Sequence, residues 1–313
     1  MGLKALVCLE LVLNALTIHY NFNALLRRFG TASKFHLRYH FKQELAIDPV
    51  QYNRQAWDKM ASAGDKYYRA MTPEQIQNAR EGQWRIRITP TKPVPPAWLE
   101  PLAGKSVLCL AGGGGQQAPI LAALGADVTV FDLSEQQLER DREIAQREGL
   151  EIKTVRGDMT DLSCFEDDLF DLIVSPCATC FCPTVEPIWR ESYRVVKKGG
   201  SLIVGFINPL YYLFDARKMD QGKFEVRHSI PYCDFDLPEE EREALIGPER
   251  PLEFGHSLEQ LIGLQIEAGF SLTGFYEDGW GAGDKLSSLI NLFIATKATK
   301  CCLLYTSPSP RDS

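Results

Sequence analysis

The sequence predicts an α/β fold built on a doubly wound, mostly parallel sheet. Short apolar runs alternate with helix-like segments between residues 106 and 207, a spacing typical of a parallel sheet covered by helices on both faces. A glycine cluster follows the first run, and an acid ends the second. Ligands bind such sheets beyond the carboxyl ends of the strands, so the same region is the expected ligand site.

Five of these runs are expected to be strands buried on both faces, because they are short and nearly continuously apolar. They are residues 106–110, 127–132, 152–156, 170–175 and 201–207. Helices are expected between them at residues 117–124, 134–148 and 186–196.

Local signals set the ends of these helices. Ser134 and Gln137 have the spacing of a capping box, and Gly149 is placed to end the same helix. Lys197 and Lys198 fit the last turn of the third helix, where cations suit the helix dipole. The glycines at 199–200 are then expected to make the turn into the fifth strand.

Composition argues against two classes of protein. Mean hydropathy is −0.17, and no apolar run approaches the ~20 residues of a membrane helix, so no association with a membrane is expected. A net charge of −7 argues against a nucleic-acid binder that relies on a positive field. Nine scattered cysteines, an odd number, do not form a disulfide framework and favour a reducing compartment.

Composition also divides the chain into four parts. Residues 1–43 carry a net charge of +5 with one acid, which is typical of a mitochondrial or plastid transit peptide. A non-native extension and a secretory signal are the alternatives. Residues 44–103 are expected to be a helical lid with a Pro-rich linker, and 104–299 the main domain with an insert at 208–255. Residues 300–313 form a tail that looks non-native. The expected location is the cytoplasm or an organelle interior.

The cofactor site is expected at the glycine cluster. Glycines at 112–115 let the backbone approach a ligand closely, and the next helix directs its free N–H groups to the same place. Asp132, at the end of the second strand, can accept hydrogen bonds from ribose hydroxyls. Asp158 can bind an adenine amino group while Met159 packs on the ring. Gly113-x-Gly115-x-x-Ala118 also matches the dinucleotide fingerprint, so a nicotinamide cofactor remains open here.

Further motifs carry a family resemblance. Gly-Asp-Met at 157–159, Phe-Asp-Leu-Ile-Val at 170–174 and Tyr-Arg-Val-Val-Lys-Lys-Gly-Gly at 193–200 resemble those of class I S-adenosylmethionine (SAM)-dependent methyltransferases. The C-terminal part is similar too, with a capped helix over 256–270 and strands over 271–277 and 290–296. The resemblance covers roughly residues 48–298. It implies a Rossmann-like, seven-stranded, mostly parallel sheet whose last strand is antiparallel.

The resemblance also implies site residues. Asp132 would bind the ribose, Asp158 and Met159 the adenine, and Ser175 would line the side of methyl transfer. The SAM-binding set would be completed by Ala111, Gly112, Gly113, Gly115, Gln116, Gln117 and Leu133.

Two residues depart from the family pattern. Cys109 and Ala111 stand where the family has an acid and its first glycine. Gln116 or Gln117 can substitute for the acid, because an amide offers donors and an acceptor. The alternative is that both are ordinary helix-surface residues.

The sequence thus predicts an enzyme that transfers a methyl group from SAM to a small-molecule acceptor. A nicotinamide-dependent oxidoreductase and an inactive SAM-binding module are the alternatives. Aromatic residues of the lid and insert are candidates for the acceptor wall. No catalytic base is identified. Three thiols at 177, 180 and 182 have spacing compatible with a metal, but loop-lining cysteines are the simpler interpretation and no metal is predicted.

Overall fold

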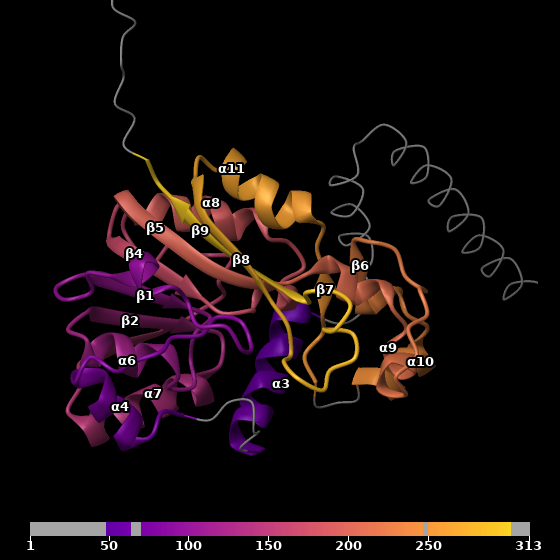
Figure 1. Cartoon of the computed structure of the whole chain (residues 1–313), viewed down its shortest axis with the longest axis horizontal. Coiled ribbons are helices and arrows are strands. Elements are labelled where there is room, and N and C mark those ends of the chain that lie inside the picture. The colour runs from indigo at the N-terminus through magenta and orange to yellow at the C-terminus, as the bar shows by residue number, and fades with distance from the viewer. Residues whose placement is uncertain (1–47, 64–69, 247–249, 302–313) are drawn as a thin grey trace, which may run out of the picture. The chain divides into compact units, whose positions relative to one another are not determined.

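A computed structural model describes residues 48–63, 70–246 and 250–301, and those from Pro49 onward belong to one compact unit. Seven strands form one sheet in the order β3-β2-β1-β4-β5-β9-β8 (Figure 1). The first five pair in parallel, and β9 runs antiparallel to both β5 and β8. The predicted fold class is confirmed. The strands are β1 Ser106–Leu110, β2 Asp127–Asp132, β3 Ile152–Arg156, β4 Phe170–Ser175, β5 Val196–Ile207, β8 Ser271–Asp278 and β9 Phe293–Thr299.

Helices cover both faces of the sheet because successive strand residues point in opposite directions. One core layer joins α6 (Gln117–Ala123) and α7 (Glu135–Glu148) to alternate residues such as Val107 and Val130. The other joins α8 (Glu186–Val195) to residues such as Leu108. This two-sided burial explains why the strand sequences are apolar without a polar alternation.

The segment before β1 is helical. It contains α3 (Pro49–Ala63), α4 (Pro73–Arg80) and the short α5 (Pro96–Leu99). The predicted start of α4 is confirmed, because Thr72 and Gln75 form a reciprocal capping box. α3 packs on α7 and α4 on α6, so these two helices lie against the helices that follow β2 and β1.

The insert follows β5 at its carboxyl end. A two-stranded antiparallel pair, β6 (Tyr232–Cys233) and β7 (Phe254–Gly255), is accompanied by α9 (Ala216–Asp220) and α10 (Glu239–Ile246), which group together in Figure 1. Within the described ranges, no helix is long and apolar enough to cross a bilayer. The parts of the chain predicted as a leader (1–43) and as the tail from 302 lie outside the described residues.

The end of α8 differs from the prediction. The helix stops at Val195, and Lys197 and Lys198 belong to β5 rather than to the last helical turn. Lys197 Nζ lies 2.8 Å from Asp171 Oδ2 on the neighbouring strand, an ion pair that a helical position would not make. Gly199 takes a φ of +80°, and the β4–β5 register shifts at this point, so the glycines form an irregularity within the strand.

Boundaries near the C-terminus also differ. Ser257 and Gln260 cap the expected helix reciprocally, but its first turns are a π-helix, Glu259–Gly263, followed by α11, Leu264–Glu267. β9 begins at Phe293 instead of residue 290, because Phe293 is the residue that pairs with the end of β5. The apolar pattern predicts that a strand lies here, but it does not predict the residue at which the strand begins.

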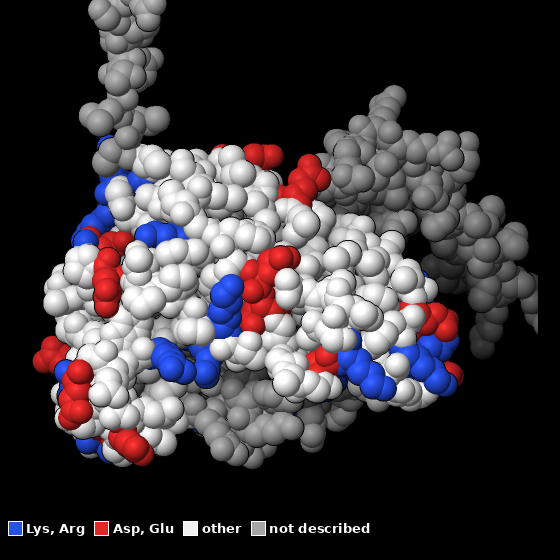
Figure 2. Space-filling view, viewed as in Figure 1, with Lys and Arg blue, Asp and Glu red and all other residues white. Residues whose placement is uncertain are grey.

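Charged side chains of both signs are interspersed on the described part of the face shown in Figure 2. The net charge of −7 is therefore not gathered into one broad patch on this face.

Candidate active site

The loop after β1 turns sharply back toward α6. Ala111 has a φ of +48°, Gly114 of +101° and Gly115 of +71°, all in the left-handed region. A Cβ on Gly115 would lie 2.1 Å from Ile144 Cδ1, so a side chain there would have to displace Ile144 and would also strain the backbone at this φ. Ala111, which replaces the family's first glycine, adopts the glycine-like conformation nonetheless.

Two carboxylates hold this loop by its backbone. Gly113 N donates to Asp132 Oδ2 at 2.9 Å. Gly114 N and Gly115 N donate to the two oxygens of Asp141 at 2.9 and 3.1 Å. These three N–H groups are therefore satisfied by the protein, and the loop is held in shape by its own acids.

Asp141 was not predicted from the sequence. It lies on α7, is fully buried, and burial raises its pKa to about 7 even though the two glycine N–H groups oppose that shift. One signal was available: Asp141 falls on the same helix face as Leu138, Ile144 and Ala145, where an acid is unexpected.

Asp132 bridges the loop and the start of α7. Its other oxygen, Oδ1, accepts from Ser134 N at 2.9 Å. Burial raises the pKa of Asp132, and the nearby negative charge of Asp58 acts in the same direction. A carboxylate has about four acceptor positions, so the two bonds leave capacity for a ligand hydroxyl.

The predicted capping box at Ser134 is only half formed. Ser134 Oγ accepts from Gln137 N at 3.2 Å, as expected. The return bond is missing because Ser134 N is held by Asp132. Among the described residues, Gln137 Oε1 is consequently buried without a partner beside Gly114.

The predicted adenine-side residues lie at the end of β3. Asp158 Oδ1 accepts from Thr160 N at 3.0 Å, which fixes the turn and leaves the carboxylate partly exposed. Met159 is buried in the core layer that also contains Leu110 and Phe131. Gly157 leaves room for Phe131, since a Cβ would lie 2.2 Å from its ring.

The remaining predicted residues lie in the glycine loop or next to it, and most of them are buried or half-buried. Gln117 Nε2 donates to Arg87 O at 2.8 Å, which ties the start of α6 to the segment before β1. Cys109 is buried, and burial raises the pKa of its thiol, so it does not replace the family's acid as a charge. Ser175 is buried at the end of β4. Of the other three, Gly112 is buried, and Gln116 and Leu133 are half-buried.

The acceptor groups of these residues suit the chemistry of SAM. The carboxylate of Asp132 lies between a loop without bulky side chains, which follows β1, and Asp158, which follows β3. Each acid stands at the end of a parallel strand and has acceptor capacity. Two carboxylates in this arrangement suit a ribose and an amino-substituted base.

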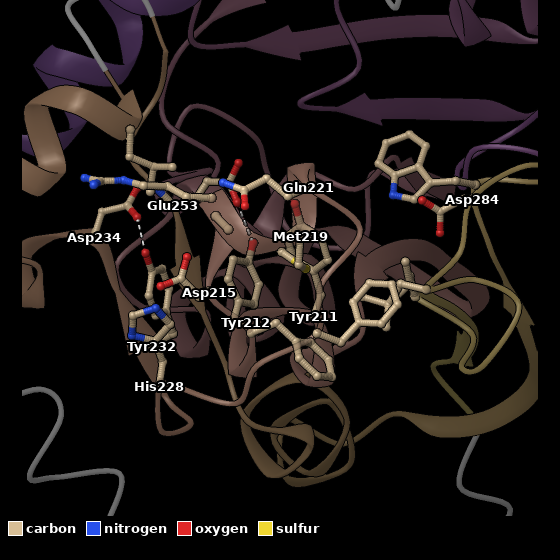
Figure 3. Close-up of a pocket in the computed structure, with 18 of the residues that line it drawn as sticks. Tyr211, Tyr212, Asp215, Met219, Gln221, His228, Tyr232, Asp234, Glu253 and Asp284 are labelled. Carbon is tan, nitrogen blue, oxygen red and sulfur yellow. Dashed lines mark hydrogen bonds between the residues drawn. The ribbon is translucent and has the colours of Figure 1, made fainter.

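A cavity of about 550 Å³ opens in the insert (Figure 3). Tyr211, Tyr212 and Phe214 follow the carboxyl end of β5, and Trp280 follows β8. Cys180, which follows β4, packs against Tyr212. Because β1, β4 and β5 are parallel neighbours, this cavity lies at the same edge of the sheet as the glycine loop.

Two acids on the cavity wall are bound to tyrosines. Tyr212 donates to Glu253 Oε2 at 2.9 Å, and Tyr232 donates to Asp234 Oδ1 at 2.7 Å, as Figure 3 shows. Glu253 N also donates to Asp234 Oδ2 at 2.6 Å. Burial raises the pKa of Glu253 to about 7. Neither acid was predicted, because they come from a segment whose fold the sequence pattern does not reveal.

The three clustered thiols follow β4, and Cys180 belongs to the same core cluster as Tyr212 and Tyr232 of the insert. Cys180 and Cys182 are buried, and Cys177 Sγ donates to Ile88 O at 3.2 Å. Within the described part of the chain, no three metal-ligating side chains are grouped to hold an ion. His256 holds the backbone of this cysteine segment, because its Nε2 lies 3.2 Å from Thr179 O and 2.9 Å from Cys182 O.

Comparison with known proteins finds similarity to methyltransferases. A family model described as "Methyltransferase domain" matches residues 108–204. An uncharacterized methyltransferase, YbaJ of Bacillus subtilis, is 51% identical over 252 residues, covering 80% of this chain and 98% of its own. A demethylmenaquinone methyltransferase of Clavibacter sepedonicus is 31% identical over 150 residues, covering 47% of this chain and 55% of its own.

Solved structures share this fold, and one of them serves as an example. It is an S-adenosylmethionine-dependent methyltransferase from Mesorhizobium loti, with a TM-score of 0.52 and 18% identity, covering 65% of this chain and 94% of that one.

Proposed function

Because this chain belongs to the class I SAM-dependent methyltransferases, we propose that it methylates a small molecule bound in the insert cavity. It is an enzyme, and SAM is its methyl donor. Neither an oxidoreductase nor an inactive binding module is favoured by the family model or by the relative that is 51% identical.

One observation carries the proposal: the 550 Å³ cavity lies beyond β4 and β5, at the edge of the sheet that also carries the glycine loop. A cavity of that volume suits a small molecule and is too confined for a folded macromolecule. The sulfonium of SAM supplies an already activated methyl group, so the main task of the protein is to align the acceptor with it.

We assign the donor side to the strand-end residues. Asp132 would orient the ribose and Asp158 the adenine, while the glycine loop is held open by Asp141. Ser175, at the end of β4, would face the acceptor side. The described cysteines are all free, which supports the proposed location in the cytoplasm or an organelle interior.

The test follows a labelled methyl group from SAM into fractions of a cell extract. The full chain is incubated with small molecules, with protein or with RNA, and the fraction that gains the label is identified. Label in the small-molecule fraction is expected. Label confined to protein or RNA would overturn the proposal.

A variant that fills the cavity localises the acceptor. Ala216 lines the cavity at the start of α9, so Ala216→Trp should raise the acceptor KM about tenfold or more while the SAM Kd stays the same. Ala97→Trp, on the exposed side of α5, is the matched control and should change neither constant. An unchanged KM in Ala216→Trp would place the acceptor elsewhere.

A further inference from the structure

The charges on the cavity wall are arranged by depth. Arg217, Arg250 and Lys285 line the cavity, and all three residues are exposed. Asp234 is buried and Glu253 half-buried. The positive groups are thus solvated, and the interior of the cavity is negative.

Two other acids of the wall are already neutralised. Asp215 and Glu241 share Arg227, whose nitrogens lie 2.8 and 2.5 Å from their oxygens. Asp234 and Glu253 have no such partner, since among the described residues neither forms an ion pair with a Lys or Arg. Their hydrogen-bond partners are hydroxyl and backbone N–H groups, and the positive charge of exposed Arg250 reaches both acids only through space, without an ion pair.

Aromatic faces stand beside the same two acids. The rings of Tyr212 and Tyr232 are stacked, with centroids 5.2 Å apart and an interplanar angle of 17°. His228 meets Tyr232 edge-on at 5.2 Å. Burial, aided by Arg227, lowers the pKa of His228, so this ring is neutral at neutral pH and adds no positive charge.

Carboxylates without an ion-pair partner beside aromatic rings attract organic cations, through Coulomb attraction and through the negative face of each ring. An anionic acceptor would meet repulsion at the same place, and a neutral one would leave the carboxylates without compensation.

We infer that the acceptor is an amine-bearing molecule whose ammonium group binds Glu253 and Asp234 beside Tyr212 and Tyr232. This inference rests on the proposed function, because it assigns the cavity to the acceptor. It concerns the anchoring group and leaves the methylated atom open.

The test compares charged and neutral probes of the same shape. The full chain, saturated with S-adenosylhomocysteine, is titrated with 2-phenylethylamine and cyclohexylmethylamine, and with the corresponding alcohols. At least one amine should bind about tenfold or more tightly than its alcohol, the scale of a charged hydrogen bond. If no amine is preferred over its alcohol, the inference is wrong.

Matched variants show whether Glu253 causes the preference for the amine. Glu253→Gln keeps an oxygen for the Tyr212 hydroxyl, so the fold should persist, and SAM affinity reports on that persistence. The amine preference should fall about tenfold in this variant. Glu240→Gln removes the same charge from an exposed position on α10 and should leave the preference intact. An equal loss in both variants would mean general charge attraction and would overturn the inference.

The dependence on pH gives a second readout. Because the pKa of Glu253 is raised to about 7, its carboxylate gains charge between pH 6 and 8, and amine affinity should rise over that interval. In Glu253→Gln the rise should disappear. The ionisable groups that face Glu253 are Tyr212, Tyr232, Asp234, Arg250 and Cys180.

The outcomes separate this inference from the proposed function. Labelled small molecules without any amine preference would leave the proposed function standing and remove the inference. An amine preference in a chain that labels only protein or RNA would establish the cation site and remove its role as the acceptor site.

Discussion

Asn53 and Leu252 are joined by two hydrogen bonds of opposite direction, although 199 residues separate them. Asn53 Oδ1 accepts from Leu252 N at 2.7 Å, and Asn53 Nδ2 donates to Leu252 O at 3.1 Å. The same amide donates to Phe181 O at 2.9 Å. One side chain of α3 therefore holds both the segment after β4 and the residue next to Glu253.

This relationship predicts the effect of Asn53→Ala. Buried backbone groups of Leu252 and Phe181 would lose their partner, at a cost of about 1–3 kcal/mol for each unsatisfied group. Three such groups are affected, so we expect the free energy of unfolding, measured with urea, to fall by about 3 kcal/mol or more. Acceptor KM should rise while the SAM Kd changes little. Asn291→Ala, at an exposed position, is the control, and an equal loss there would contradict the role of Asn53.

The hydrogen bonds from the glycine loop to Asp141 predict that substitution of Asp141 lowers SAM affinity. Asp141→Ala would leave Gly115 N unsatisfied and Gly114 N with Gln137 O alone, and the SAM Kd should rise about tenfold or more. Asp141→Asn keeps one acceptor oxygen and should lie between that variant and the wild type. Calorimetric titration measures both. Glu139→Ala, which is exposed on the same helix, should bind SAM normally, and a normal Kd in Asp141→Ala would contradict this account.

The strands of this fold are predictable from sequence because their signals are local. A strand buried on both faces needs a continuous apolar run, and the runs that become β1 and β2 show one without knowledge of any neighbour. The helix that starts at Thr72 is predictable for the same reason, since both members of its capping box lie within one turn.

The unpredicted features depend on contacts between distant segments. Ser134 N is the exception, because it binds the side chain of Asp132 two residues before it instead of Gln137, which is a local competition between two side chains. Lys197 lies in β5 and not in the predicted helix, because it forms an ion pair with Asp171 on the adjacent strand. Glu253 and Asp234 become one site only when β6 and β7 pair, and nothing local in either segment indicates that pairing.

Asp158 provides a direct test of the adenine assignment. Its carboxylate remains partly exposed at the end of β3, so Asp158→Ala should raise the SAM Kd about tenfold or more through loss of a charged hydrogen bond. Asp132→Ala should weaken SAM as well, and it should also loosen the glycine loop through Gly113 N. Asp161→Ala, three residues further along an exposed turn, is the control. An unchanged Kd in Asp158→Ala would place the adenine elsewhere.

His256 predicts a specific loss of stability in acid. Burial lowers its pKa from 6.5 to about 4, and Nε2 lies within hydrogen-bonding distance of two backbone carbonyls while, among the described residues, Nδ1 has no partner. The unfolded chain therefore binds a proton at a higher pH than the folded chain does. The stability from this group is complete above pH 6.5 and is lost as the pH falls toward 4.

The measurement is the free energy of unfolding in urea at several pH values between 7.5 and 4.5. This one group should contribute a slope of about 1.4 kcal/mol per pH unit below pH 6.5, up to about 3 kcal/mol in all. His256→Gln can still donate to one of the carbonyls, but its side chain does not titrate. Other groups act equally in both proteins, so the difference between the two curves isolates His256, and parallel curves would show that its proton affinity is the same in the folded and unfolded states.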